Sequence, residues 1–78
     1  MAWRIGDEMR MFFFIIGETD ETLLKVISID EETVTLDEFG IDDDGNEGYR
    51  VFNRKTGKCL NDNTWGGARR YITRCSEV

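Results

Sequence analysis

Residues 23–37 read Leu-Leu-Lys-Val-Ile-Ser-Ile-Asp-Glu-Glu-Thr-Val-Thr-Leu-Asp, and this segment constrains the architecture more than any other. Leu, Val and Ile dominate its first half, and its second half alternates polar and apolar residues. Such alternation is typical of a strand with one buried face. Asp30-Glu31-Glu32 supplies a short polar turn between the halves. The segment therefore predicts a β-hairpin in which Val34 and Leu36 point inward.

Other segments with strand character lie on both sides of this hairpin. Met9–Ile16 is apolar on both faces, which predicts a strand that is buried on both sides or bends between two sheets. The residues Gly17–Glu21 are expected to form a polar loop. The remaining candidate strands are Trp3–Ile5, Tyr49–Asn53, Cys59–Leu60 and Arg69–Cys75.

Five or six short strands at a spacing of roughly ten residues predict an all-β fold. We expect a small five- to six-stranded antiparallel barrel, because closure hides the strand edges of a chain that contains no proline. The chain has 78 residues, of which 40% are hydrophobic. Residues 1–78 are therefore expected to form one small domain with a modest core. Trp3 and the Phe12-Phe13-Phe14 run are expected to fill this core, although they could also form an exposed patch.

The longest apolar run, Met11–Ile16, is far shorter than the roughly 20 residues of a membrane helix. Asp7 and Glu8 precede it and no small-residue cleavage site follows, so we expect no signal peptide and a cytoplasmic location. In that compartment Cys59 and Cys75 are expected to be free thiols, with a disulfide between them as the alternative. No metal site is expected, since two cysteines without histidine cannot supply the four soft ligands that zinc prefers.

The composition also limits the chemistry of the chain. It contains no histidine, which is the commonest general acid–base residue. No Ser–His or Cys–His nucleophile pair can therefore form. The sequence predicts a non-enzymatic protein with no catalytic residues and no cofactor.

The charges of the chain are segregated along the sequence. Residues 1–48 hold fourteen acidic and three basic side chains, whereas residues 49–78 hold two acidic and seven basic ones. The net charge is -6. Small domains usually intersperse the two signs, and a segregated distribution produces a field that steers partners. The charge pattern therefore predicts two candidate binding regions.

The first candidate region is an acidic loop expected at residues 37–48, in which glycines allow the backbone to adapt. Phe39 and Ile41 are expected to tuck inward from it. Our hypothesis is that its carboxylates bind a basic groove on a partner protein, much as DNA phosphates would. The alternatives are a solvated run of charge or a weak affinity for divalent cations, because the spacing does not match a calcium-binding loop. The candidate residues are Asp37, Glu38, Asp42, Asp43, Asp44 and Glu47.

The second candidate region is the basic second half of the chain. A basic surface with an interleaved aromatic side chain is typical of small barrels that hold single-stranded nucleic acid or nucleotides. The same residues could instead form a protein interface, or pair with the acidic strands across the sheet. The candidate contacts are Arg54, Lys55, Lys58, Trp65, Arg69, Arg70 and Arg74.

Three segments carry a resemblance to a known family. They are Trp-Arg-Ile-Gly-Asp at 3–7, Val-Ile-Ser-Ile-Asp-Glu-Glu-Thr-Val-Thr-Leu at 26–36, and Tyr-Arg-Val-Phe-Asn-Arg-Lys-Thr-Gly-Lys at 49–58. The order resembles the small SH3-like β-barrel proteins of bacteriophages, with Val51 inserted between the Arg and Phe of an Arg-Phe-Asn-Arg-x-Thr-Gly segment. The resemblance implies a phage origin, and small acidic phage proteins frequently inhibit a host enzyme or defence complex.

Together these features predict a phage-type inhibitor or accessory factor that engages a host protein through its acidic loop. Nucleic-acid or nucleotide binding by the basic face is the alternative. No membrane association is expected. A chain with one acidic and one basic region can also form a homodimer.

Overall fold

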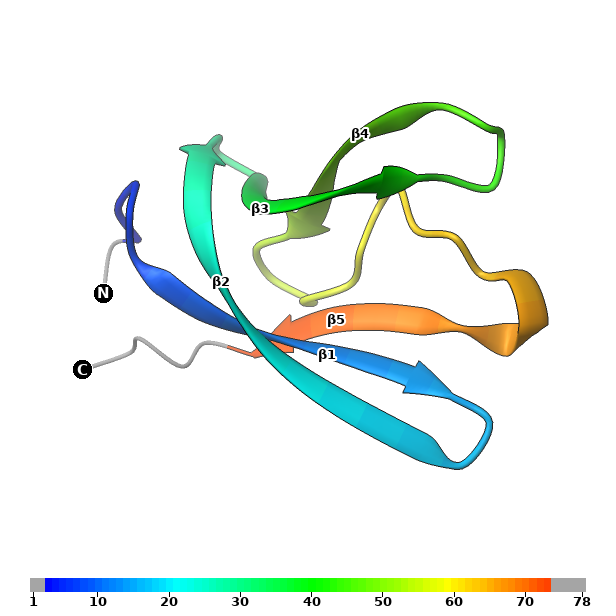
Figure 1. Cartoon of the computed structure of the whole chain (residues 1–78). Coiled ribbons are helices and arrows are strands. Elements are labelled where there is room, and N and C mark those ends of the chain that lie inside the picture. Colours follow the sequence, from blue (N-terminus) through cyan, green and yellow to red (C-terminus); the bar gives the residue numbers. More distant parts are fainter. Residues whose placement is uncertain (1–2, 74–78) are drawn as a thin grey trace.

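The computed structural model describes residues 3–73, which form one curled antiparallel sheet (Figure 1). Its elements are β1 (Glu8–Ile15), β2 (Glu18–Ile29), β3 (Thr33–Ile41), β4 (Glu47–Asn53), the 3₁₀ turn η1 (Trp65–Gly67) and β5 (Arg69–Thr73). The strand order is β4-β3-β2-β1-β5. The all-β prediction is confirmed, and so is the hairpin over residues 23–37. Among residues 3–73, no helix has the length and apolar character needed to cross a bilayer.

The core lies on the concave side of the sheet. Because side chains alternate along a strand, β1 directs Met9 and Met11 inward, where both are buried. Phe12 lies on the outer face and stacks on Tyr71, with 5.3 Å between the ring centroids. No second sheet covers this outer face among the described residues, so the prediction that β1 is buried on both sides is wrong. The buried apolar cluster consists of Trp3, Met9, Met11, Val26, Val34, Leu36, Phe52 and Ile72.

Residues 57–61 close one end of the sheet by joining its two outer strands. Single bridges connect Cys59 to Phe52 of β4 and Lys58 to Tyr71 of β5. The Asn61 side chain continues this closure, because its Oδ1 accepts the Val51 N–H at 2.9 Å and its Nδ2 donates to the Tyr49 carbonyl at 2.8 Å. An amide side chain thus pairs with the edge of β4 as a neighbouring strand would.

The other end of the sheet is open, which makes the fold a half-barrel. β2 pairs with β3 only over Val26–Ile29, and the first half of β2 pairs with β1 alone. Register shifts occur in both strands at this point, and Asp37 Oδ1 accepts the Lys25 N–H at 2.9 Å. The Asp37 carboxylate therefore replaces the backbone carbonyl that would accept the next hydrogen bond between β2 and β3. Beyond it the β1–β2 and β3–β4 hairpins diverge (Figure 1).

The loops predicted at residues 37–48 and 17–21 are shorter than expected, because most of both segments is strand. β3 continues to Ile41 and β4 begins at Glu47, so only residues 42–46 connect the strands in the segment predicted as a loop at 37–48. Phe39 and Ile41 are exposed strand residues rather than inward plugs. Residues 17–21 are also mostly strand, because β1 and β2 are joined by a two-residue turn at Ile16 and Gly17, both at positive φ.

A substitution at Gly57 tests how closely residues 57–61 pack against β5. Gly57 has a φ of 80°, and a Cβ at this position would lie 2.3 Å from the Ile72 carbonyl oxygen. Gly57→Ala should lower the free energy of unfolding by about 3 kcal/mol, because it adds a backbone clash to the strain of positive φ. Gly45→Ala is the matched control, since Gly45 has a φ of 88° with open space around it. The free energy of unfolding of the control, measured by urea denaturation, should fall by only about 1 kcal/mol. Equal losses for both variants would contradict this packing.

Candidate functional site

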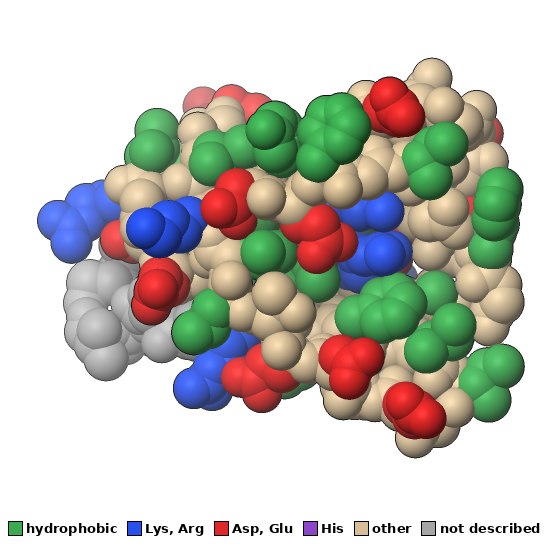
Figure 2. Space-filling model, in the orientation of Figure 1, with side chains coloured by type: hydrophobic (Ala, Val, Ile, Leu, Met, Phe, Trp, Pro, Cys, Tyr) green, Lys and Arg blue, Asp and Glu red, His purple; other side chains and the backbone are tan. Residues whose placement is uncertain are grey.

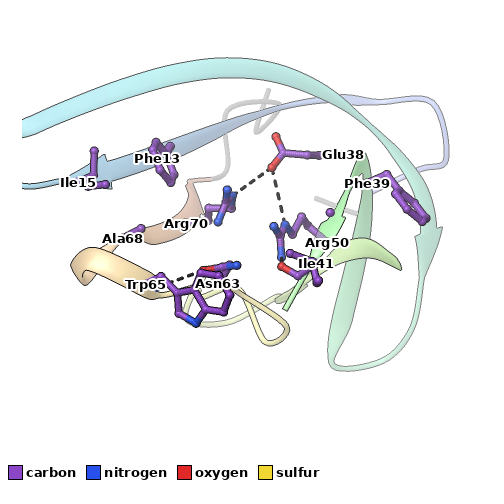
Figure 3. Close-up of a pocket in the computed structure, with 11 residues that line it drawn as sticks. Phe13, Ile15, Glu38, Phe39, Ile41, Arg50, Asn63, Trp65, Ala68 and Arg70 are labelled. Atoms are coloured by element: carbon purple, nitrogen blue, oxygen red, sulfur yellow. Dashed lines mark hydrogen bonds and ion pairs between the residues drawn. The ribbon is translucent and has the colours of Figure 1, made fainter. Parts of the chain in front are cut away.

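Four charged side chains meet inside the open mouth of the half-barrel, above the apolar core. They come from β3 (Glu38), β4 (Arg50), β5 (Arg70) and the segment before η1 (Asp62). Glu38 Oε2 lies 3.1 Å from Arg70 Nε and 3.8 Å from Arg50 Nε, as Figure 3 shows. Arg70 Nη1 also donates to Asp62 Oδ1 at 2.6 Å. We call these four residues the mouth cluster.

Arg50 is the most deeply buried member, with 3% of its surface exposed. Its Nη1 donates to the carbonyls of Ile41 at 3.0 Å and Asn61 at 2.7 Å, while its Nε has no hydrogen-bond partner. Gly40 makes room for the guanidinium, because a Cβ there would lie 2.5 Å from Arg50 Nη2. A buried charge is costly unless it is paired, so Arg50 depends on the carboxylate of Glu38 and these two carbonyls.

Arg70 is held on three sides. Its guanidinium lies 4.7 Å from the centroid of the Phe13 ring, in a cation–π contact. Glu38 and Asp62 accept hydrogen bonds from its side chain, and Asp62 Oδ2 also accepts the Arg70 backbone N–H at 2.7 Å. Both ends of Arg70 are therefore fixed by the same aspartate.

A cleft of about 410 Å³ opens beside the mouth cluster. Glu38, Arg50 and Arg70 contribute to its wall. Trp65 on η1 leaves 69% of its surface exposed at the rim, whereas Phe39 points away from the two arginines in Figure 3. The apolar part of the lining consists of Phe13, Ile15, Phe39, Ile41, Trp65 and Ala68.

The acidic turn at residues 42–46 is held by its own carboxylates. Asp42 Oδ1 accepts the backbone N–H groups of Asp44 and Asn46, both at 2.9 Å. Asp43 accepts the backbone N–H and the hydroxyl of Thr64, each at 2.7 Å. These two bonds, that of the backbone N–H first, lower the pKa of the Asp43 carboxyl below its usual value. The turn is thus fastened to the segment before η1.

The six predicted acidic residues therefore do not form one free surface. Asp37 ends the β2–β3 pairing, Glu38 lies in the mouth cluster, and Asp42 and Asp43 hold the turn. The other two, Asp44 and Glu47, are exposed, and no basic side chain of residues 3–73 lies within ion-pairing distance of either.

The predicted basic residues are also dispersed. Arg54 lies at the closed end, 5.3 Å from the centroid of the Trp3 ring, and donates to the Asp30 carbonyl. Lys55 is exposed near it and lines the same hollow. Lys58 and Arg69 line an outer groove that does not include Trp65. Arg70 lines the same cleft as Trp65, but Arg54, Lys55, Lys58 and Arg69 lie elsewhere, so the predicted grouping of all these residues around Trp65 is wrong. Arg74 lies outside the described residues.

The sequence did not reveal Asp62 and Asn61 as structural residues, although part of the mouth cluster was visible in it. The alternation of the last strand places Arg70 on the same face as the apolar Ile72, which indicates an arginine directed inward. Nothing comparable marks Asp62 or Asn61, because both lie in a segment without periodicity.

Cys59 is half-buried, and burial raises the pKa of its thiol to about 11, with the charge of Asp62 as the second cause. Cys59 is therefore a protonated thiol at neutral pH rather than a reactive thiolate. Cys75 lies outside the described residues, so the question of a disulfide is not addressed by the structure. Within residues 3–73, no three Asp, Glu, Cys or His side chains come together as a set that could hold a metal ion.

Comparisons of this chain with protein-family models, curated proteins and solved structures find no match. The site is therefore interpreted from its geometry alone.

Glu38 provides a test of the mouth cluster. Glu38→Gln removes the carboxylate that faces two arginines, one of them buried, and should lower the free energy of unfolding by about 3 kcal/mol. Glu21→Gln is the matched control, because Glu21 pairs with Arg10 at 2.9 Å on the exposed outer face. The free energy of unfolding of the control should fall by about 0.5 kcal/mol or less. Similar losses in urea denaturation would contradict a stabilising role for the cluster.

Proposed function

We propose that this protein is a non-enzymatic binding module that engages the basic surface of a partner protein. The observation that carries the proposal is the excess of acids over bases among the exposed side chains of residues 3–73. Arg50 is buried and Arg70 is largely covered within the mouth cluster. Glu38 and Asp62 are withdrawn with them, so the mouth cluster is neutral and the exposed surface keeps the acidic excess of the sequence.

The exposed side chains illustrate this imbalance. The exposed acids are Glu8, Glu18, Asp20, Glu21, Asp30, Glu31, Glu32, Asp37, Asp43, Asp44 and Glu47. The exposed bases of the described residues are Arg4, Arg10, Lys25, Lys55, Lys58 and Arg69. In Figure 2 acidic side chains are spread over the viewed face, with apolar side chains between them. Such a surface attracts a basic partner and raises the rate of association.

Exposed aromatic side chains add the apolar contacts that a protein interface needs. Trp65 stands at the cleft, and Phe39 packs edge-to-face on Tyr49 on the outside of the β3–β4 hairpin. Aromatic residues are enriched at protein interfaces, where they contribute large contact areas. An acidic surface with aromatic anchors suits a protein partner better than a phosphate backbone.

The resemblance to phage SH3-like barrels leads to a more specific form of the proposal. In this form the protein acts in the host cytoplasm as an inhibitor or accessory factor. Its acidic surface would occupy a basic groove on a host protein, in the manner of DNA. The dispersed acids support a broad acidic face rather than a single DNA-mimicking loop.

One observation favours nucleic-acid binding as a second candidate function. The outer groove of about 600 Å³ places the basic Lys58 and Arg69 beside the aromatic Phe14 and Tyr71. Cations for phosphates next to rings for base stacking are the elements of a single-strand site. The net charge of -6 opposes it.

Affinity capture from a bacterial lysate can separate these two functions. Replacing Glu18, Asp20, Glu31 and Glu32 with their amides should slow the association of a captured protein about tenfold at low salt. The matched variant Lys58→Gln/Arg69→Gln should retain it, and nuclease treatment should have no effect. Capture that survives both neutralisation of the four acids and about 500 mM salt contradicts the proposal. Capture that is lost with nuclease or with the basic variant favours nucleic acid.

A further inference from the structure

The first half of β2 has an open backbone edge. The Val26 N–H donates to the Asp7 carbonyl on the β1 side, and the Lys25 N–H donates to Asp37 on the β3 side. Because successive residues of a strand direct their backbone groups to opposite sides, those of Thr19, Glu21 and Leu23 face away from β1. Within residues 3–73, no strand pairs with this side of Glu18–Leu24.

The side chains along this edge continue the lining of the cleft. The register pairs Phe13 with Asp20 and Ile15 with Glu18, and directly opposed residues share a face of the sheet. Phe13 and Ile15 line the cleft, so Asp20 and Glu18 lie on the same concave face. A segment laid along the edge would therefore meet two apolar side chains and two carboxylates on its inward side.

Arg50 contributes a buried cation to the wall of the cleft. It lines the cleft from a position that is almost wholly buried, and its Nε lacks a hydrogen-bond acceptor. Buried donors without partners are rare in folded proteins and require an explanation. The carboxylate of Glu38, 3.8 Å from this Nε, is its electrostatic partner.

We propose that an extended segment of the basic partner adds a strand to the open edge of β2 at Glu18–Leu24. Its inward side chains are lysines or arginines, whose aliphatic stems lie against Phe13 and Ile15 and whose charges pair with Glu18 and Asp20. Main-chain hydrogen bonds provide the affinity of such strand addition, and side-chain pockets provide the specificity. This inference rests on the proposed function and names the mode in which the partner binds.

The charge along the edge disfavours a second copy of this chain as the occupant. Antiparallel pairing of two β2 strands about Thr19 would place Glu18 of each copy directly opposite Asp20 of the other. Like charges directly opposite each other destabilise a strand pair. Acidic edges therefore prevent self-pairing while they accept a basic strand.

The test uses a capped peptide of about ten residues that alternates lysine and valine. A twin peptide with N-methylated interior amides has the same charge but cannot pair as a strand. We expect the first peptide to slow amide hydrogen exchange at Thr19, Glu21 and Leu23 at least about tenfold. The twin should bind about tenfold more weakly and leave these amides unchanged.

Variants locate the binding on the protein. Glu18→Gln/Asp20→Asn should weaken binding of the first peptide about fivefold or more, because it removes both inward carboxylates of the edge. Asp44→Asn/Glu47→Gln removes the same charge from the β3–β4 turn and should change binding less than about twofold.

Each contrary outcome overturns a distinct claim. Equal binding of the two peptides with unchanged exchange contradicts strand addition and leaves the proposed acidic binding surface standing. A larger effect of the Asp44/Glu47 variant places the site on the turn and overturns the inference. Protection of the edge amides that rises with the concentration of the protein alone assigns the edge to a second copy. Failure of both peptides to bind at about 50 mM salt contradicts the inference and the proposed function together.

Discussion

The carboxylate of Glu38 faces two guanidinium groups inside the mouth of the half-barrel, 3.1 Å from Arg70 Nε and 3.8 Å from Arg50 Nε. Arg50 could not remain buried without this carboxylate and its two carbonyl acceptors, because an uncompensated charge in the interior costs several kcal/mol. The cluster links β3, β4 and β5, which are not all neighbours in the sheet. It holds together the end of the fold that the apolar core does not reach.

The open edge of β2 follows from this arrangement. Asp37 ends the pairing of β2 with β3 at the border of the core, and the next residue, Glu38, enters the mouth cluster. The hairpins then diverge around a polar interior instead of closing into a full barrel. Because the cluster pairs two arginines with two carboxylates, it is neutral and leaves the acidic excess of the sequence on the surface.

The sequence predicted the fold better than the site. Alternation in residues 23–37 identified the hairpin and its inward Val34 and Leu36, because the period of a strand is local information. The extent of the acidic loop was predicted wrongly, since Asp42 and Asp43 stabilise a short turn through contacts that composition does not reveal. The segregated charges suggested two separate sites, yet Glu38 from one pairs with Arg70 from the other. Pairing over this sequence distance depends on the closure of the sheet, which no local pattern encodes.

A double-mutant cycle between Glu38 and Arg70 tests the central claim most directly. Unfolding free energies of the wild type, Glu38→Gln, Arg70→Gln and the double variant give their coupling energy without the other effects of each change. The account predicts a favourable coupling of about 1–3 kcal/mol, because both charges are largely withdrawn from water and share a hydrogen bond. Additive effects within about 0.5 kcal/mol would contradict it and reduce the pair to an incidental contact.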